Sequence, residues 1–183
     1  MSNPKDTRDN PDDAWPFDEV MRSGRAFARA QQKKYQDYLA ENDPTLFTKL
    51  QEEDARFDVV KHDAIEPVMR EVAGEVERRG WHAAVLCDDD HDRLAFLATP
   101  SIRLYWRREP FQAPAASDFA FPPSFVAFYG CAQTQTVRTH VELALWDEHA
   151  GSQVREASLE YPEVTGDAVR SVLAAVLDDL ERS

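Results

Sequence analysis

The chain has 183 residues, enough for one ordinary domain with an appendage or for two small domains. Hydrophobic residues make up 43% and charged residues 30%, which excludes a wholly disordered chain. No apolar run reaches the roughly eighteen residues that a membrane span needs. The polar N-terminus resembles neither a signal peptide nor a transit peptide, so we expect a soluble, cytoplasmic protein without a membrane span.

The net charge is −13, from 34 acidic and 21 basic side chains. Such a charge repels nucleic acid and anionic membranes over most of a protein surface. Three explanations of the acidity stay open: solubility, a salt-rich habitat, or a surface that meets a basic partner or imitates DNA.

The first half of the chain is predicted to be helical. Residues 1–15 contain little that could be buried, and we expect them to be disordered. A first helix is predicted to begin at 16–18, where a proline and acidic residues suit a first helical turn. Asn42 ends this helix, and Asp43 and Pro44 begin the second as its N-cap and first residue.

A third helix is predicted from Asp63 or Glu66 to Arg79. The spacing of Asp63 and Glu66 resembles a capping box, and Pro67 is tolerated only in a first turn. Gly80 supplies a left-handed stop. The alternative is that the second and third helices form one helix with a kink near Pro67.

Beyond Gly80 the apolar period changes from helical to two, which indicates strands joined by short turns. The run Asp88–Asp92 is predicted to be the first turn, and 109–123 a long Pro- and Ala-rich loop. Six mostly antiparallel strands are expected, at 82–87, 93–99, 101–108, 124–132, 136–147 and 153–161.

A closing helix is predicted to begin at Thr165 or Asp167. Its apolar stripe and that of the third helix should cover the same face of the sheet. The fold class is therefore α+β: N-terminal helices, a mostly antiparallel six-stranded sheet covered on one face by helices, and a C-terminal closing helix. The expected divisions of the chain are a disordered tail at 1–15, a helical arm at 16–60 and an α+β domain at 61–183.

No catalytic or cofactor motif stands out, and no metal or cofactor is expected. Cys87 and Cys131 lie in apolar strand-like runs and are interpreted as reduced, buried thiols. The acidic run Asp88–Asp92 is interpreted as a solvated turn, with weak binding of calcium or magnesium as the alternative. Cys131 and His140 are considered as a nucleophile and base, but nothing in the sequence orients the histidine. Enzyme activity stays open, with the weight against it.

The first helix carries a basic stripe opposite its apolar face. Its members fall within about 60° of one another on a helical wheel. A stripe of this kind can bind phosphates, lie on an anionic membrane, or dock on an acidic surface, including that of a second copy in a homodimer. The alternative is a solvated outer face. The stripe consists of Arg22, Arg25, Arg29 and Lys33.

Two further surfaces are binding candidates. If Ile102, Leu104 and Trp106 face the helices, other strand residues share the opposite face, where arginine beside an aromatic ring suits RNA, phosphate or carboxylate recognition. The Pro-rich loop offers Phe119 and Phe121 as a lid over the core or as a hydrophobic contact for a partner. The residues expected on the opposite sheet face are Arg103, Tyr105, Arg107, Arg138 and His140.

Three functional hypotheses remain. The first is a non-enzymatic protein-binding protein: an adaptor, an inhibitor, or an immunity-like or chaperone-like protein. The second is a nucleic-acid-linked protein, either an acidic DNA mimic or a binder that uses the basic stripe or the sheet face. The third is an enzyme of unrecognised type, which would need a deep pocket that holds His140, Cys131 or the acidic run Asp88–Asp92 with perturbed pKa values.

Overall fold

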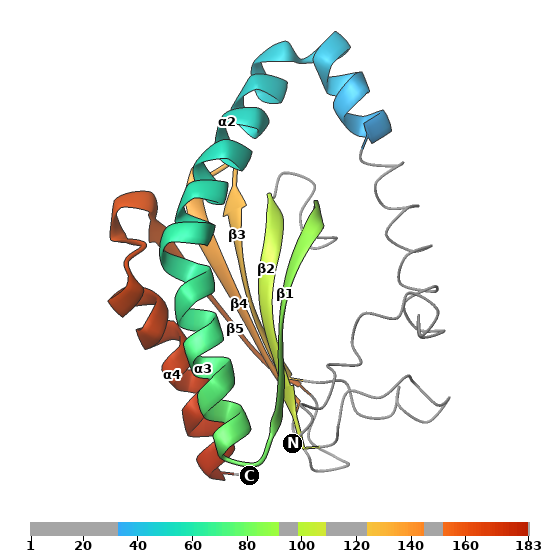
Figure 1. Cartoon of the computed structure of the whole chain (residues 1–183). Coiled ribbons are helices and arrows are strands. Elements are labelled where there is room, and N and C mark those ends of the chain that lie inside the picture. The colour runs from blue at the N-terminus through green and yellow to red at the C-terminus, as the bar shows by residue number, and fades with distance from the viewer. Residues whose placement is uncertain (1–32, 92–98, 109–123, 145–151, 183) are drawn as a thin grey trace, which may run out of the picture.

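The computed structural model describes residues 33–91, 99–108, 124–144 and 152–182 (Figure 1). The elements in chain order are a helical segment at 33–42, α2 (Pro44–Val60), a π-helical turn (Lys61–Ile65), α3 (Glu66–Arg78), β1 (His82–His91), β2 (Pro100–Arg107), β3 (Ser124–Cys131), β4 (Thr136–Ala144), β5 (Ser152–Glu160), a 3₁₀ turn (Tyr161–Glu163) and α4 (Gly166–Arg182).

The start of α2 is set by local chemistry. The Asp43 carboxylate accepts a hydrogen bond from the backbone N–H of Leu46 at 3.0 Å, and Pro44 occupies the first turn. This satisfies a backbone donor that the helix itself leaves without a partner. The predicted N-cap at Asp43 is confirmed.

Helices α2 and α3 are joined through the π-helical turn rather than separated by a cap. The predicted capping box of Asp63 and Glu66 is wrong, since the residue at the N-cap position, Ile65, is itself helical and makes no side-chain cap. Pro67 explains the wide turn, because proline lacks an N–H and its ring collides with the carbonyl four residues earlier. In the wide turn, the N–H of Glu66 bonds to the carbonyl of Lys61 instead.

The end of α3 follows the prediction. Gly80 has φ of +83°, in the left-handed region that glycine adopts without steric cost. The N–H of Trp81 then bonds to the carbonyl of Val76 at 3.3 Å, and the Trp81 side chain is buried against the core. Residues 76–81 thus turn the chain from the helical layer into β1.

The sheet is an antiparallel meander in the order β1-β2-β3-β4-β5. The α+β class is confirmed, but five strands are described where six were expected; the expected strand at 93–99 lies outside the described residues except for Thr99. The turn expected at Asp88–Asp92 is also wrong in its first four residues, because β1 continues to His91. The pairing with β2 shifts register between Cys87 and His91 within this extension. The strand therefore bends locally rather than turning back.

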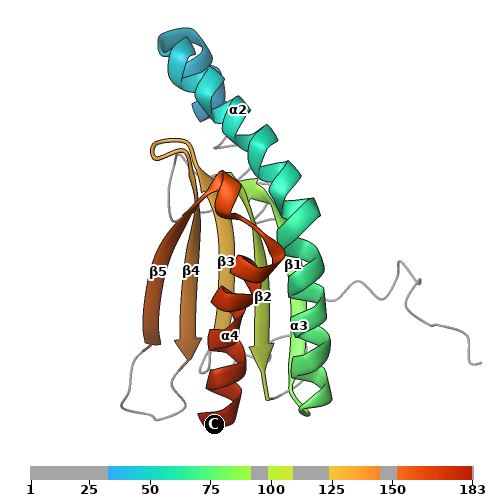
Figure 2. The ribbon, with the colours of Figure 1, turned by 90° about the vertical axis from the view of Figure 1, so that its left-hand side faces the viewer.

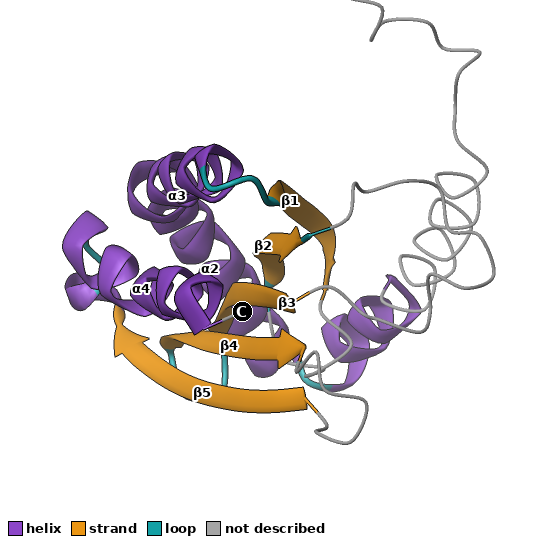
Figure 3. Cartoon of the chain, turned by 90° about the horizontal axis from the view of Figure 1, so that it is seen from below, coloured by secondary structure: helices purple, strands orange, loops and turns teal. Residues whose placement is uncertain are grey.

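Helices α3 and α4 lie on one face of the sheet, as Figures 2 and 3 show. Their apolar stripes pack against Trp106, Phe128 and the other inward residues of the strands in one core. The expectation that both stripes cover the same face is confirmed. Helix α2 enters this core through Phe57, whereas its first turns extend beyond the end of the sheet (Figure 2). Among the described helices, none is long and apolar enough to cross a membrane.

Candidate functional site

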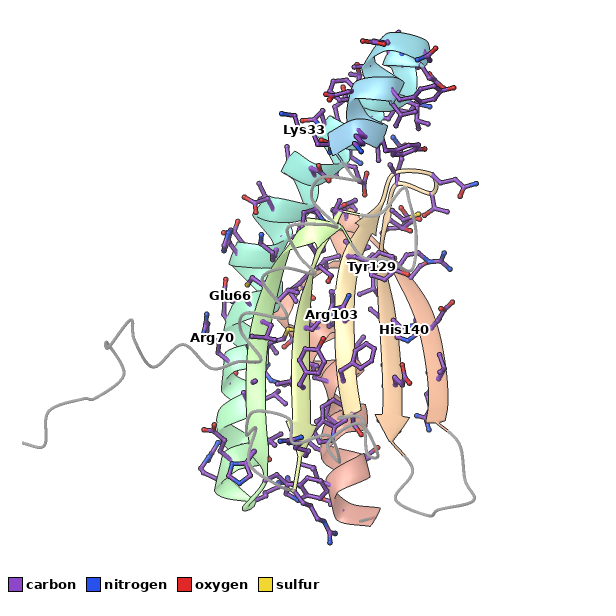
Figure 4. The ribbon with its side chains drawn as sticks, turned by 90° about the vertical axis from the view of Figure 1, so that its right-hand side faces the viewer. Lys33, Glu66, Arg70, Arg103, Tyr129 and His140 are labelled. Atoms are coloured by element: carbon purple, nitrogen blue, oxygen red, sulfur yellow. The ribbon has the colours of Figure 1, made fainter. Side chains whose placement is uncertain are left out.

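The face of the sheet turned away from α3 and α4 carries polar and aromatic side chains. Directly opposed residues of neighbouring strands point to the same face. The register pairs Tyr105 with Phe125, Phe125 with Glu142, and His140 with Glu156. Figure 4 shows Arg103, Tyr129 and His140 on this face.

Aromatic rings form a continuous row across β2, β3 and β4. The ring centroids of Tyr105 and Phe125 are 5.5 Å apart, and those of Phe125 and His140 are also 5.5 Å apart, with the latter rings stacked at 23°. The Arg103 guanidinium lies 5.7 Å from the Phe125 centroid and donates a hydrogen bond to the Tyr105 hydroxyl at 3.2 Å. Such stacking and cation–π contacts fix the side chains in one arrangement.

Beyond this row the face becomes charged. His140 is 7% exposed and has two carboxylates beside it: Nδ1 lies 3.3 Å from Glu156 and Nε2 lies 3.7 Å from Glu142. The Arg138 guanidinium is 3.9 Å from Glu156. Arg138 and His140 therefore each lie beside a carboxylate of the same face.

The outer part of this face, here named the β4–β5 patch, reaches solvent. Val154 is 50% exposed, and the side chains of Arg138 and Glu156 are 40% and 54% exposed. Ser158, opposite Arg138, is exposed as well. The patch consists of Arg138, His140, Glu142, Val154, Glu156 and Ser158, with the apolar Val154 opposite Glu142 and polar residues along the rest.

The structure thus brings together four of the predicted site residues, Arg103, Tyr105, Arg138 and His140. Arg107 lies on the same face two residues beyond Tyr105, opposite His82, the first residue of β1. Of the basic stripe, only Lys33 is described; it is exposed at the start of the helical segment 33–42. Arg22, Arg25, Arg29, Phe119 and Phe121 lie outside the described residues.

The considered pair of Cys131 and His140 is not assembled. Cys131 is opposite Thr136, whereas His140 is opposite Ala127, four residues away along β3. At the rise of a strand this separation is roughly 13 Å, too far for proton transfer between the side chains. Burial raises the pKa of Cys131, but hydrogen bonds from Thr134 and Gln133 outweigh it and lower the pKa. Both cysteines are thiols rather than a disulfide; Cys131 is buried as expected, but Cys87 is exposed, so the expectation of a buried Cys87 is wrong.

A buried acid on α2 was missed by the sequence reasoning. Glu53 is 2% exposed and accepts a short hydrogen bond from the Tyr161 hydroxyl. The contact requires Gly130, since a Cβ there would lie 2.6 Å from that hydroxyl and 2.9 Å from the Thr99 methyl. An isolated glycine inside a strand often marks such a close approach, so Gly130 was the available signal.

Burial raises the pKa values of Glu53 and of its neighbour Asp54 on α2. The pKa of Glu53 is raised by burial, although the hydrogen bond from Tyr161 and the charge of Arg56 oppose the shift. Burial and then the charge of Glu53 raise the pKa of Asp54 to about 6. Burial, followed by the hydrogen bond to Glu53, also raises the pKa of Tyr161. The neutral forms of these groups are therefore favoured in the folded chain.

A pocket of about 330 Å³ opens beside Asp54, between α2 and the start of β2. Lys61 in its lining lies 2.6 Å from Asp58, so this cation is already engaged. Among the described residues, its lining contains neither Cys131 nor His140 nor a member of the acidic run Asp88–Asp92, the groups that the enzyme hypothesis requires. Its lining residues are Asp54, Ala55, Phe57, Asp58, Lys61 and Pro100.

Comparisons with family models, curated proteins and solved structures gave no match for this chain. The geometry of the site is therefore the basis of the functional argument.

Proposed function

We propose that this chain is a non-enzymatic protein-binding protein of the adaptor, inhibitor, immunity-like or chaperone-like kind, and that the β4–β5 patch contacts the partner. The observation that carries the proposal is the character of the patch. Exposed Val154 lies opposite Glu142 and two residues from Glu156 on the same face, and the packed aromatic row continues from this patch across β4, β3 and β2. An apolar contact ringed by polar groups is typical of protein interfaces.

The same geometry weighs against the sheet face as a site for nucleic acid. Phosphate recognition needs cations that are available to the ligand. On this face Glu156 lies within 4 Å of Arg138 and offsets its positive charge, and the carboxylates of Glu142 and Glu156 beside His140 repel phosphates. The basic stripe on the first helix remains a separate route to nucleic acid or to a homodimer, with Lys33 as its described member.

The test is affinity capture of the tagged full chain from its own cells, with and without nuclease and at two salt concentrations. The proposal expects a protein that is recovered in stoichiometric amount and survives nuclease. A second copy of the chain would favour the homodimer. Recovery of nucleic acid that is lost at the higher salt would instead favour the basic stripe, and a chain recovered alone would overturn the proposal.

A further inference from the structure

We infer that the outer edge of β5 accepts an extended segment of the partner as an added antiparallel strand, and that this segment carries a basic side chain opposite Glu156. The inference rests on the proposed function and names the kind of partner. Among the described strands, β1 and β5 form the two edges of the sheet.

The two edges differ in regularity. The pairing of β1 with β2 shifts register between Cys87 and His91, and such an irregularity protects an edge from further pairing. The pairing of β4 with β5 is unbroken from Thr136–Glu160 to Ala144–Ser152. In the part of the chain that the structure describes, β4 is the only strand that pairs with β5.

The strand β5 is also accessible on both of its faces. Residues 154–158 are all exposed, although successive residues point to opposite sides of the sheet. The helical layer therefore leaves the middle of β5 uncovered. A regular strand at a sheet edge presents backbone groups that pair with another chain, which is how several domains bind extended peptides.

The carboxylate of Glu156 and the negative net charge determine which kind of segment fits this edge. A strand added at this edge places its side chains directly opposite Val154, Glu156 and Ser158 on the patch face. An apolar residue suits Val154, and a Lys or Arg suits the exposed carboxylate of Glu156. In the antiparallel pairing of two copies centred on Glu156, the two carboxylates would face each other, so that register is disfavoured for a second copy. The net charge of −13 also favours a basic partner.

The test is selection of a displayed random nonapeptide library against the full chain in its wild-type, Glu156→Lys and Glu77→Lys forms. Glu77 is exposed on α3, away from β5, so Glu77→Lys makes the same charge change as a matched control. The wild type and the control are expected to enrich peptides with Lys or Arg two positions before an apolar residue, which is the antiparallel order. Glu156→Lys is expected to enrich an acidic residue at that position and to bind the wild-type winner about fivefold less tightly.

Hydrogen exchange of the wild type with the selected peptide then locates the contact. Protection at 152–160, lost when alternate amides of the peptide are N-methylated, is the expected result. Absence of enrichment, the same enrichment for all three proteins, or protection confined to the helices would overturn the inference. If capture of the cellular partner fails with Glu156→Lys while the peptides show no basic, extended pattern, strand addition is wrong and the proposed function stands.

Discussion

Nδ1 of His140 lies 3.3 Å from Oε1 of Glu156, and the two residues face each other directly across β4 and β5. His140 is buried against the ring of Phe125, whereas more than half of the Glu156 side chain is exposed. The pair thus joins the packed aromatic row to the solvent-facing patch. Substitution of His140 should therefore affect the packing of the sheet, whereas substitution of Glu156 should affect partner binding.

Replacing His140 should cost stability, and replacing Glu156 should not. We expect His140→Ala to lower the free energy of unfolding by about 1–3 kcal/mol, because the stack on Phe125 and the buried ring are lost. Glu156→Gln removes one exposed charge and should change the free energy of unfolding by less than about 0.5 kcal/mol. Urea denaturation at pH 7 measures both. Equal losses in the two variants would refute this division of roles.

Gly130 should tolerate no side chain. In Gly130→Ala the new methyl group would meet the Tyr161 hydroxyl, the Thr99 methyl and a Glu53 oxygen at 2.6, 2.9 and 3.0 Å. We expect a loss of about 2 kcal/mol or more. Adding Tyr161→Phe removes the closest atom, so the double variant should lose less than the sum of the single variants.

Gly74→Ala is the matched control for this prediction, because nothing lies within 4 Å of a Cβ at that helical position. It should stabilise the chain by about 0.5–1 kcal/mol, as alanine favours a helix over glycine. Thermal and urea unfolding of the wild type, both Gly130→Ala proteins and Gly74→Ala measures these differences in stability. An unchanged Gly130→Ala protein would show that the close approach of Tyr161 to β3 is not required.

Asp54 should make stability fall as pH rises. Its pKa of about 6 in the folded chain exceeds its ordinary value of 3.8, so the folded state binds the proton more tightly. The stabilising contribution is complete below pH 3.8 and is lost as pH rises through 6, on the order of 3 kcal/mol. We expect Asp54→Asn to be more stable than the wild type at pH 7.5 and similar to it near pH 4.

Asp58 serves as the control of opposite sign. A hydrogen bond from Lys61 outweighs burial and lowers the pKa of this exposed carboxyl, so ionised Asp58 stabilises the fold. Asp58→Asn should be less stable than the wild type at pH 7.5, and the difference should vanish as pH falls below the folded pKa. Urea titrations at both pH values measure the two effects. An Asp54→Asn variant that is less stable at pH 7.5 would disprove the argument from burial.

The two cysteines should react at very different rates. Cys87 is exposed and Cys131 is buried. A thiol reagent should label one cysteine rapidly and the second only on the timescale of opening of the β3–β4 end. Cys87→Ser should remove the fast phase, and Cys131→Ser the slow one. Fast labelling of Cys131 would contradict its burial.

The elements that sequence predicts well are those with local causes. Asp43 caps α2 and Gly80 ends α3 through contacts within a few residues, and both are readable from the chain. The π-helical turn is only half predictable. Pro67 signals a conflict with the helix, but whether the chain breaks or widens depends on the packing of Ile65 and its neighbours in the core.

The sites depend on distant contacts, and that limits what the sequence predicts. Glu53 lies on the stripe of Leu50 and Phe57, but acids are seldom buried without a partner, and its partner is 108 residues away. Alternation places Arg103 and His140 on one face. The contact of His140 with Glu156 needs the register between β4 and β5, which no local pattern fixes.

The most direct test of the central claim, protein binding through the β4–β5 patch, is quantitative capture of the cellular partner by wild type, Glu156→Lys and Glu77→Lys. The unfolding midpoint of each variant is first compared with that of the wild type, so that only equally stable proteins are used for capture. We expect equal recovery of the same partner with wild type and Glu77→Lys, and a reduction of about fivefold or more with Glu156→Lys. Undiminished recovery with Glu156→Lys, or equal loss with both variants, would contradict the claim.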